Sequence, residues 1–313
     1  MPKAIETLKN LKAGHFGLGV HGGGPASVKQ AVHDGDTIIV RALGNLSVRF
    51  LGIDTPEISF MPPGKQSFVG IGHADWEAFL SNPFDPRWQL PDFPQPLRDY
   101  LEARVGPGCA ANHHRHAMIA QRGLEAEVEA DQNRLGHDNE SFRFFLAFAH
   151  EVMDRYGRLL GYINVETDES PRPADYNARL LERALALPYF IWPNVNPFRR
   201  QPSLPDAVPA PGRAAAVADE EKTLRQAREM IRTARAEKRG LFDANDPLRL
   251  EAFELRYLAG RRLPGRWLVD LSGSADELVP PHRYFEIPHP EDRLWIPEAY
   301  VPLFVEKGWR RGA

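Results

Sequence analysis

Two apolar, β-branched segments lie close together near the start of the chain. They run from Thr37 to Val40 and from Val48 to Ile53, and Gly44-Asn45 lies between them. Glycine and asparagine both tolerate a positive φ, which a tight turn between antiparallel strands requires. The pattern therefore predicts a β-hairpin about Gly44-Asn45, in which Asp36 at the head of one strand lies opposite Asp54 at the end of the other.

Further along the chain, the hydrophobic spacing predicts a second hairpin and three helices. The segments from Phe142 to Ala149 and from Leu159 to Val165 are typical of strands. Apolar residues at helical spacing predict helices from His113 to Glu129, from Ala174 to Ala186 and from Glu220 to Arg239, the last stopped by Gly240. The glycine-rich stretch from Leu11 to Pro25 is expected to be a flexible lead-in.

The composition is that of an ordinary globular protein. The chain has 313 residues, of which 42% are hydrophobic and 26% charged, enough for one large or two modest domains. The single cysteine, Cys109, excludes an intramolecular disulfide and a cysteine-rich zinc site. Neither the segment from Met1 to Ala13 nor any later run is apolar enough for a secretory signal or a membrane span. A cytoplasmic location is therefore the simplest expectation.

Charged residues of the first hairpin indicate a site for a cation and a phosphate. Asp36 and Asp54 would repel each other across the hairpin unless a cation neutralised them, and their hard oxygens favour Ca²⁺ or Mg²⁺. Arg49 shares a strand face with apolar residues, so we expect a partly enclosed guanidinium that pairs with an anion such as phosphate. Glu57 follows the second strand and would act on a water beside the metal.

Three segments carry a combined signal: Asp34-Gly35-Asp36-Thr37, then Arg49-Phe50-Leu51-Gly52-Ile53-Asp54-Thr55-Pro56-Glu57, and far downstream Asp154-Arg155-Tyr156-Gly157-Arg158-Leu159-Leu160-Gly161-Tyr162-Ile163. These segments resemble the signatures of the staphylococcal-nuclease (thermonuclease) family, and they occur in the family's order. The resemblance implies an α+β fold in which helices flank a five-stranded OB-type β-barrel. It also implies a Ca²⁺-dependent phosphodiesterase whose substrate is DNA or RNA, with Mg²⁺ or Mn²⁺ as the alternative ions.

The same resemblance implies a role for each matching residue. The residues expected to bind the metal are Asp36, Asp54 and, through its carbonyl, Thr55. Asp34 would support these ligands without touching the ion. Arg49 and Arg158 would hold the scissile phosphate and stabilise its transition state, while Glu57 would activate or orient the attacking, metal-associated water. The residues expected to contact other groups of the substrate are Arg155, where a lysine is usual in the family, Tyr156 and Tyr189.

The family barrel accounts for only part of the chain, about 150 residues. We expect a lead-in over 1–26 and a nuclease-like domain over 27–242, with an insertion at about 59–108 and a proline-rich loop without regular structure at about 196–213. The aromatic residues of the insertion favour packing over the stacking of nucleic-acid bases. The aromatic- and proline-rich extension 243–313, whose role is open, is expected to pack on the core or form a small β-rich module.

A histidine cluster at the start of the first predicted helix has two interpretations. His113 and His116 share a helix face, and with Cys109 they could form a metal clip. The preferred interpretation is that the cluster, which includes His114, consists of polar residues on a solvated helix.

Two other function classes stay open beside a nuclease. One is a catalytically inactive OB-fold module that binds nucleic acid or protein, and the other is a phosphodiesterase for small substrates. The presence of Asp36, Arg49, Asp54, Glu57 and Arg158 together favours catalysis. The formal net charge of -3 is unusual for a protein that binds long polyanions, and it favours a short or single-stranded substrate.

Overall fold

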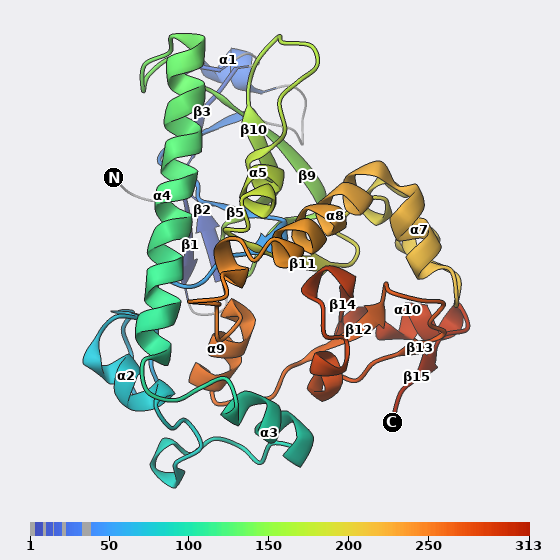
Figure 1. The fold of residues 1–313 in the computed structure, drawn as a ribbon. Helices are drawn as coiled ribbons and strands as arrows, with labels where there is room; N and C mark the ends of the chain where they lie inside the picture. Colours follow the sequence, from blue (N-terminus) through green and yellow to red (C-terminus); the bar gives the residue numbers. More distant parts are fainter. Residues whose placement is uncertain (1–3, 9–10, 15, 21–22, 33–38) are drawn as a thin grey trace. The chain divides into compact units, whose positions relative to one another are not determined.

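The structure is a computed structural model that describes residues 4–8, 11–14, 16–20, 23–32 and 39–313. It is a mixed α+β fold, which confirms the predicted class at that level (Figure 1). The chain forms two compact units. The first consists of Met1–Phe50 and Phe148–Gly161, and the second of Leu51–Ala147 and Tyr162–Ala313.

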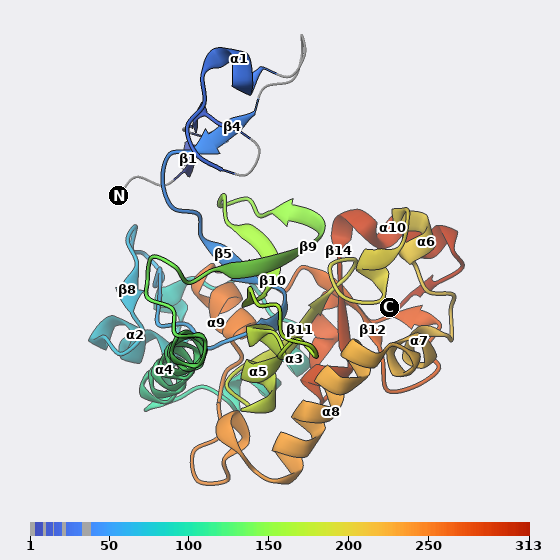
Figure 2. The ribbon, with the colours of Figure 1, turned by 90° about the horizontal axis from the view of Figure 1, so that it is seen from above.

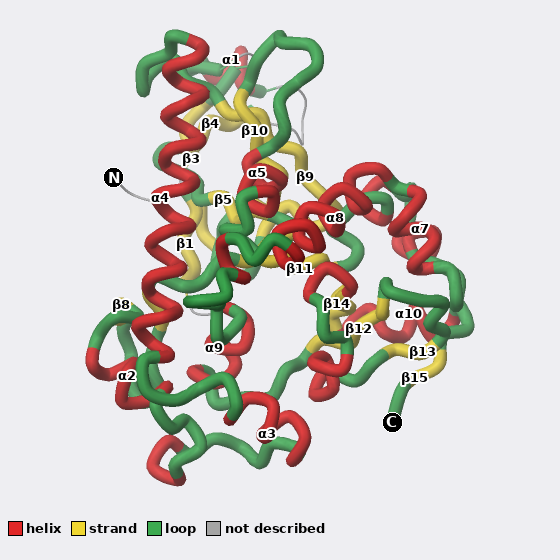
Figure 3. Tube along the Cα trace, viewed as in Figure 1, coloured by secondary structure: helices red, strands yellow, loops and turns green. Residues whose placement is uncertain are grey.

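The described residues form short strands, α-helices and 3-10 helices, and the helices and strands are distinguished by colour in Figure 3. The strands are β1 (Ile5–Leu8), β2 (Leu11–Gly14), β3 (Phe16–Leu18), β4 (Val40–Ala42), β5 (Val48–Phe50), β6 (Gly52–Asp54), β7 (Ser59–Phe60), β8 (Val69–Gly70), β9 (Phe144–Met153), β10 (Leu159–Val165), β11 (Leu187–Ile191), β12 (Arg266–Asp270), β13 (Glu277–Leu278), β14 (Arg293–Pro297) and β15 (Arg310–Arg311). The α-helices are α1 (Val28–Ala31), α2 (Ala74–Leu80), α3 (Gln95–Glu102), α4 (Cys109–Leu135), α5 (Tyr176–Glu182), α6 (Leu204–Ala207), α7 (Ala214–Glu220), α8 (Lys222–Ala236), α9 (Ala252–Ala259) and α10 (Val301–Glu306). The 3-10 helices are η1 (Pro86–Trp88), η2 (Phe198–Arg200), η3 (Gly240–Phe242), η4 (Pro281–Glu286), η5 (Pro290–Asp292) and η6 (Glu298–Tyr300).

A four-stranded sheet with the order β12-β14-β11-β6 organises the second unit. The β12–β14 and β11–β6 pairs are antiparallel, whereas β11 and β14 run parallel. Strand β6 lies at one edge, where Asp54 is the register partner of Leu187 on β11. The sheet therefore fixes the backbone of one predicted metal ligand.

One hydrophobic core contains residues of both the insertion and the C-terminal extension. Trp76 and Phe79 come from the insertion and are buried in a cluster with Phe253, Tyr284 and Trp295 of the extension. Most of the other aromatic residues of the insertion are partly buried against the same cluster, whereas Phe68 is exposed. The partly buried ones are Phe60, Phe84, Trp88, Phe93 and Tyr100. The prediction that the insertion packs is confirmed, as is the prediction that the extension packs on the core.

Helix α4 is the long helix of the second unit, and Figure 2 views it nearly along its axis. Its N-terminal cap is Gly108, and Gly136 ends it, both with the positive φ that glycine adopts without strain. Helix α2 packs against α4, and so does α5, which also contacts α8 and β6. The helix predicted from His113 to Glu129 is thus confirmed and extends at both ends.

The predicted hairpin about Gly44-Asn45 is wrong. Strand β4 pairs antiparallel with β3, and β5 pairs in parallel with β10, so the backbone groups that the hairpin needed are bonded elsewhere. The carbonyl of Asn45 accepts a hydrogen bond from the amide of Ala4 at 3.2 Å instead of closing a tight turn. Asp36, expected opposite Asp54, lies outside the described residues.

The predicted OB-type barrel is not found among the described residues. Their strands form several small sheets, none of which closes into a barrel. The expected flexible lead-in contains the described strands β2 and β3, which are short pieces bonded to β1 and β4. The proline-rich loop contains the short helix α6, because Pro205 lies in its first turn, where a missing amide is tolerated, and Ser203 caps the amide of Asp206.

Other predicted elements agree with the structure. Strand β10 has the predicted bounds, and β9 begins two residues after Phe142 and extends beyond Ala149. Helix α8 lies within the predicted segment and begins at the cap Glu221, whose side chain accepts from the amide of Leu224. Helix α5 is shorter than predicted, because Arg183 caps it and Ala184 has a positive φ of 51°.

Candidate active site

The predicted site residues fall into two groups that the structure describes separately. Asp54, Thr55, Glu57 and Tyr189 belong to the second unit. The residues that belong to the first unit are Arg49, Arg155, Tyr156 and Arg158. Asp34 and Asp36 lie outside the described residues.

Helix α5 holds the start of strand β6 through one buried asparagine. The Asn177 side chain donates to the carbonyl of Leu51 at 2.8 Å and accepts from the amide of Ile163 at 3.1 Å. Gly52 has a φ of 74°, and a Cβ there would lie 3.2 Å from the hydroxyl of Tyr162. Leu51 and Gly52 come shortly before Asp54 in the chain, so their contacts help to fix the position of the Asp54 carboxylate.

Helix α4 holds the loop that carries Glu57. The amide of Glu57 donates to Nε2 of His113 at 2.8 Å, and His113 is fully buried. Burial lowers the pKa of His113 to about 3, since it disfavours the charged ring, so the ring is neutral and can accept this bond at ordinary pH.

The histidines are therefore not on a solvated face. His113 and His116 are buried, and Nε2 of His116 lies 2.8 Å from the backbone carbonyl of Asp246. The preferred interpretation is wrong for these two residues, because the helix is covered on that face by the segment before α9. The Nε2 atom of each ring lies within hydrogen-bond distance of a backbone group, whereas Nδ1 of His113 is buried without a hydrogen-bond partner among the described residues.

Arg256 of α9 joins Asp54 to Glu57. Its Nη1 donates to Oδ1 of Asp54 at 3.0 Å and to Oε1 of Glu57 at 2.7 Å, and its Nη2 donates to Oδ2 of Asp54 at 2.6 Å. The exposed fraction is 5% for the Asp54 side chain, 24% for Glu57 and 19% for Arg256. Burial alone would lower the pKa of Arg256, but the charge and hydrogen bonds of Asp54 and the charge of Glu57 raise it above its ordinary value.

Tyr189 lies beside this group on strand β11. Its ring stacks on Phe253, with centroids 5.8 Å apart, and the Arg256 guanidinium lies 6.0 Å from its centroid. Its hydroxyl accepts a hydrogen bond from Nη1 of Arg266 at 2.9 Å. The Nε of Arg266 is buried without a hydrogen-bond partner among the described residues. Two guanidinium groups from the C-terminal extension thus lie around the predicted substrate-binding tyrosine.

In the first unit, a tight turn presents Arg158. Oδ1 of Asp154 accepts from the amides of Tyr156 and Arg158, at 2.8 and 3.0 Å, and Gly157 takes the φ of 83° that the turn requires. Nε of Arg158 donates to Oδ2 of Asp154 at 2.7 Å. The Arg158 side chain is 42% exposed, so the pair with Asp154 orients a guanidinium that solvent reaches. These bonds lower the pKa of Asp154, although burial acts in the opposite direction.

Of the two predicted catalytic arginines, Arg49 lies on a strand of the first unit and Arg158 lies in the turn before the neighbouring strand. Arg49 on β5 is the register partner of Leu160 on β10, which begins at Leu159, directly after Arg158. Tyr156 is 56% exposed next to them, and Nη2 of Arg155 donates to its hydroxyl at 2.5 Å.

The donor atoms that the structure describes fit a hard cation in kind. Oδ1 of Asp54 and Oε1 of Glu57 both lie within hydrogen-bond distance of one nitrogen, so they converge on one position for positive charge. Carboxylate oxygens are the ligands that Ca²⁺ and Mg²⁺ prefer. In the described part of the chain, no group of three or more His, Cys, Asp or Glu side chains is arranged to hold a metal. Asp36, the other predicted carboxylate ligand, is not in that part.

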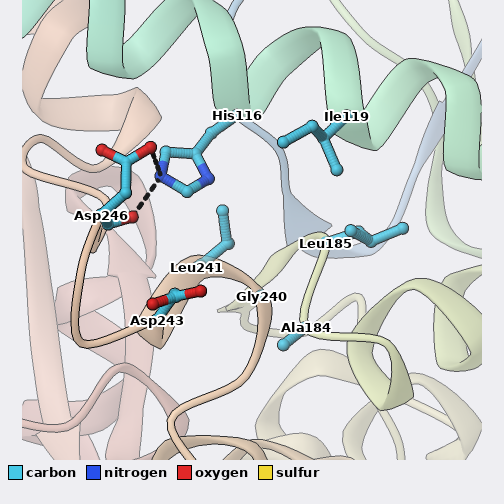
Figure 4. A pocket seen from close by; sticks show the side chains of 8 residues that line it. All are labelled: His116, Ile119, Ala184, Leu185, Gly240, Leu241, Asp243 and Asp246. Carbon is cyan, nitrogen blue, oxygen red and sulfur yellow. Dashed lines mark hydrogen bonds and ion pairs between the residues drawn. The ribbon is translucent and has the colours of Figure 1, made fainter.

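A pocket of about 180 Å³ lies away from these carboxylates, between α4, the end of α5 and the segment around η3. Figure 4 shows His116 and Asp246 on one side of it and Ile119 and Leu185 on another. Among the residues that the structure describes, none of those predicted for the nuclease site lines this pocket.

Sequence reasoning missed Arg256, Arg266 and the role of His113. A signal for Arg256 does exist in the sequence: together with Glu254, it interrupts the otherwise apolar run Phe253, Leu255, Tyr257 and Leu258, all of them buried. An arginine placed there requires a carboxylate partner. Its carboxylate partners lie about 200 residues earlier in the sequence, so no local pattern predicts which ones it binds.

No protein-family model, curated protein or solved structure matches the chain. In the part of the chain that the structure describes, every helix is too short or too polar to cross a membrane.

Proposed function

We propose that the chain is a metal-dependent nuclease of the staphylococcal-nuclease type, hydrolysing phosphodiester bonds of DNA or RNA with Ca²⁺ as its ion. The observation that carries the proposal is the convergence of the Asp54 and Glu57 carboxylates on one cationic nitrogen. In the proposal, Asp54 holds the ion together with Asp36 and the Thr55 carbonyl, and an OB-type barrel frames the site. When bound, the ion supplies positive charge for the phosphoryl oxygens and acidifies a neighbouring water.

The chain's own residues divide the remaining work. Arg49 and Arg158 bind the phosphoryl oxygens, where negative charge grows in the transition state, and the solvent-exposed guanidinium of Arg158 supports this role. Glu57 orients the attacking water, and the His113 bond to its amide holds it in place. Arg155 and Tyr156, exposed next to Arg158, and Tyr189, beside Arg266, contact other parts of the substrate.

The decisive test is cleavage by the purified full-length protein. Single-stranded DNA, duplex DNA and RNA are each incubated with Ca²⁺, Mg²⁺ or EDTA. The proposal expects cleavage that requires the divalent ion and is greatest with Ca²⁺. Asp54→Asn should abolish measurable cleavage, whereas Asp99→Asn, a change of the same type at an exposed position on α3, should not. Cleavage that is undiminished by EDTA would contradict the proposal.

A non-catalytic binding module is the second candidate, and one observation favours it. Arg256 already pairs with both carboxylates, so a metal is not required as their source of positive charge. This candidate expects binding of single-stranded nucleic acid, detectable by fluorescence anisotropy, without cleavage under any of the three conditions. Hydrolysis of bis(p-nitrophenyl) phosphate without cleavage of polymers would instead indicate a phosphodiesterase for small substrates.

A further inference from the structure

The Arg256 guanidinium occupies the position at which the carboxylates of the proposed cation site converge. Its two terminal nitrogens donate to the two carboxylate oxygens of Asp54. One of these nitrogens, Nη1, also donates to the carboxylate of Glu57. A two-pronged arginine–carboxylate pair is among the strongest ion pairs in proteins, and little water reaches this one, because Asp54 is 5% exposed.

A divalent ion held by both Asp54 and Glu57 would occupy the position between the two carboxylates that a nitrogen of Arg256 now occupies. The two cations would also repel each other at contact distance, in surroundings with little water to screen them. Cation binding and the Arg256 fork therefore exclude each other on Asp54, at least in part.

The backbone of Arg256 cannot move away easily. Helix α9 is anchored in the core by its buried neighbours Phe253, Leu255 and Leu258. The Arg256 side chain itself is 19% exposed, so part of it reaches the surface. Release must therefore occur by rotation of this side chain while the helix stays in place.

We propose that Arg256 is an internal competitor that keeps the cation site closed until a divalent ion displaces it. This inference rests on the proposed function and concerns the regulation of the same site. It makes the C-terminal extension, which carries Arg256, a determinant of how much Ca²⁺ the protein needs. The apparent affinity for Ca²⁺ is reduced by the fraction of molecules in which the Arg256 pair is open.

The test is a calorimetric titration of the EDTA-treated, dialysed full-length protein with Ca²⁺. Arg256→Gln should bind Ca²⁺ at least about tenfold more tightly than the wild type, as expected if the pair is closed in nine of ten molecules. Adding Asp54→Asn to Arg256→Gln should remove this binding. The matched control is Arg115→Gln, which breaks another two-pronged arginine pair, with Asp246, and should leave the Ca²⁺ affinity as in the wild type.

Equal Ca²⁺ affinity in the wild type and Arg256→Gln would overturn the inference, and so would a folded Arg256→Gln that binds no Ca²⁺. If Arg256→Gln is unfolded without Ca²⁺, its recovery on adding Ca²⁺ supports the inference. If Arg256→Gln stays unfolded, Arg256→Lys is the test variant, because lysine keeps the positive charge but cannot bind both oxygens of Asp54 with a planar guanidinium. Tighter Ca²⁺ binding by Arg256→Lys than by the wild type supports competition. Unchanged Ca²⁺ binding contradicts it.

Cleavage assays on the same samples separate this inference from the proposed function. If the wild type cleaves with Ca²⁺ and Arg256→Gln binds Ca²⁺ with unchanged affinity, only the competitor role is overturned. An Arg256→Gln that binds Ca²⁺ tightly, when neither protein cleaves any substrate, supports the competitor role and overturns the nuclease.

Discussion

His113 links helix α4 to the loop of Glu57, and its burial makes that link sensitive to pH. Its pKa is about 3 in the folded protein against 6.5 for an ordinary histidine, so between these values the unfolded chain binds more protons. Stability must therefore fall as pH decreases through 6.5, by about 1.4 kcal/mol per pH unit from this residue. We predict that His113→Gln flattens the pH dependence of the free energy of unfolding between pH 6 and 4.

Urea denaturation at a series of pH values measures this effect. The slope against pH is compared, not the absolute stability, because the substitution also alters the bond to the Glu57 amide. His114→Gln is the control, since His114 is only partly buried on the same helix. Equal slopes in the wild type and His113→Gln would show that His113 is not the titrating group.

Arg49 and Arg158 should behave alike in kinetics if both bind the phosphoryl group. We predict that replacing either by alanine lowers kcat/KM by about 10²–10⁴-fold. Lysine should restore little, because a point charge does not replace a two-pronged donor. Single-turnover cleavage of a short DNA measures the rates of the alanine and lysine variants. The control is Arg98→Ala, which removes an exposed arginine on α3. A loss at Arg49 without one at Arg158 would remove Arg158 from the proposed catalytic pair.

At the scale of elements, the insertion and the C-terminal extension share one core. Phe253 of α9 contacts Trp295 and Tyr284 at ring-centroid distances of 4.8 and 5.0 Å, in the cluster that also holds Trp76 of α2. We predict that Phe253→Ala lowers the free energy of unfolding by about 3–5 kcal/mol. Val305→Ala on α10 is the control, because Val305 is 43% exposed. Thermal and urea denaturation should show one transition in both variants, and a loss below about 1 kcal/mol for Phe253→Ala would contradict the shared core.

Elements whose signal is local were predictable, and their pairing was not. The bounds of β10 and the position of α8 follow from hydrophobic spacing and from caps such as Glu221. Strand β5, in contrast, pairs with β10, more than a hundred residues away, whereas Gly44-Asn45 indicated a neighbour close in sequence. A turn signal gives the propensity of two residues to form a turn. The partner of a strand depends instead on which other strand the whole fold places beside it.

At the scale of the whole molecule, the candidate site was only half visible in the sequence. The motifs indicated Asp54 as a metal ligand and Glu57 beside the metal, and the structure brings both carboxylates to one point. The cation at that point comes from residue 256, in the extension for which the sequence offered no function. Because a buried charge is neutralised by whatever the fold brings near it, an ion pair of this range cannot be read from either segment alone.

The charge of the whole chain leads to the last prediction. With a formal net charge of -3, attraction to a long polyanion must come from a few local groups, of which Arg49, Arg155 and Arg158 are the proposed ones. Each phosphate contact on a single strand contributes about -0.7 to the slope of log K against log salt, so three contacts predict a slope of about -2. Anisotropy of a labelled single-stranded 10-mer in EDTA, between 50 and 200 mM NaCl, measures it. Arg158→Ala should make the slope shallower by about 0.7, and a wild-type slope steeper than about -5 would show that a much larger basic surface contacts the strand.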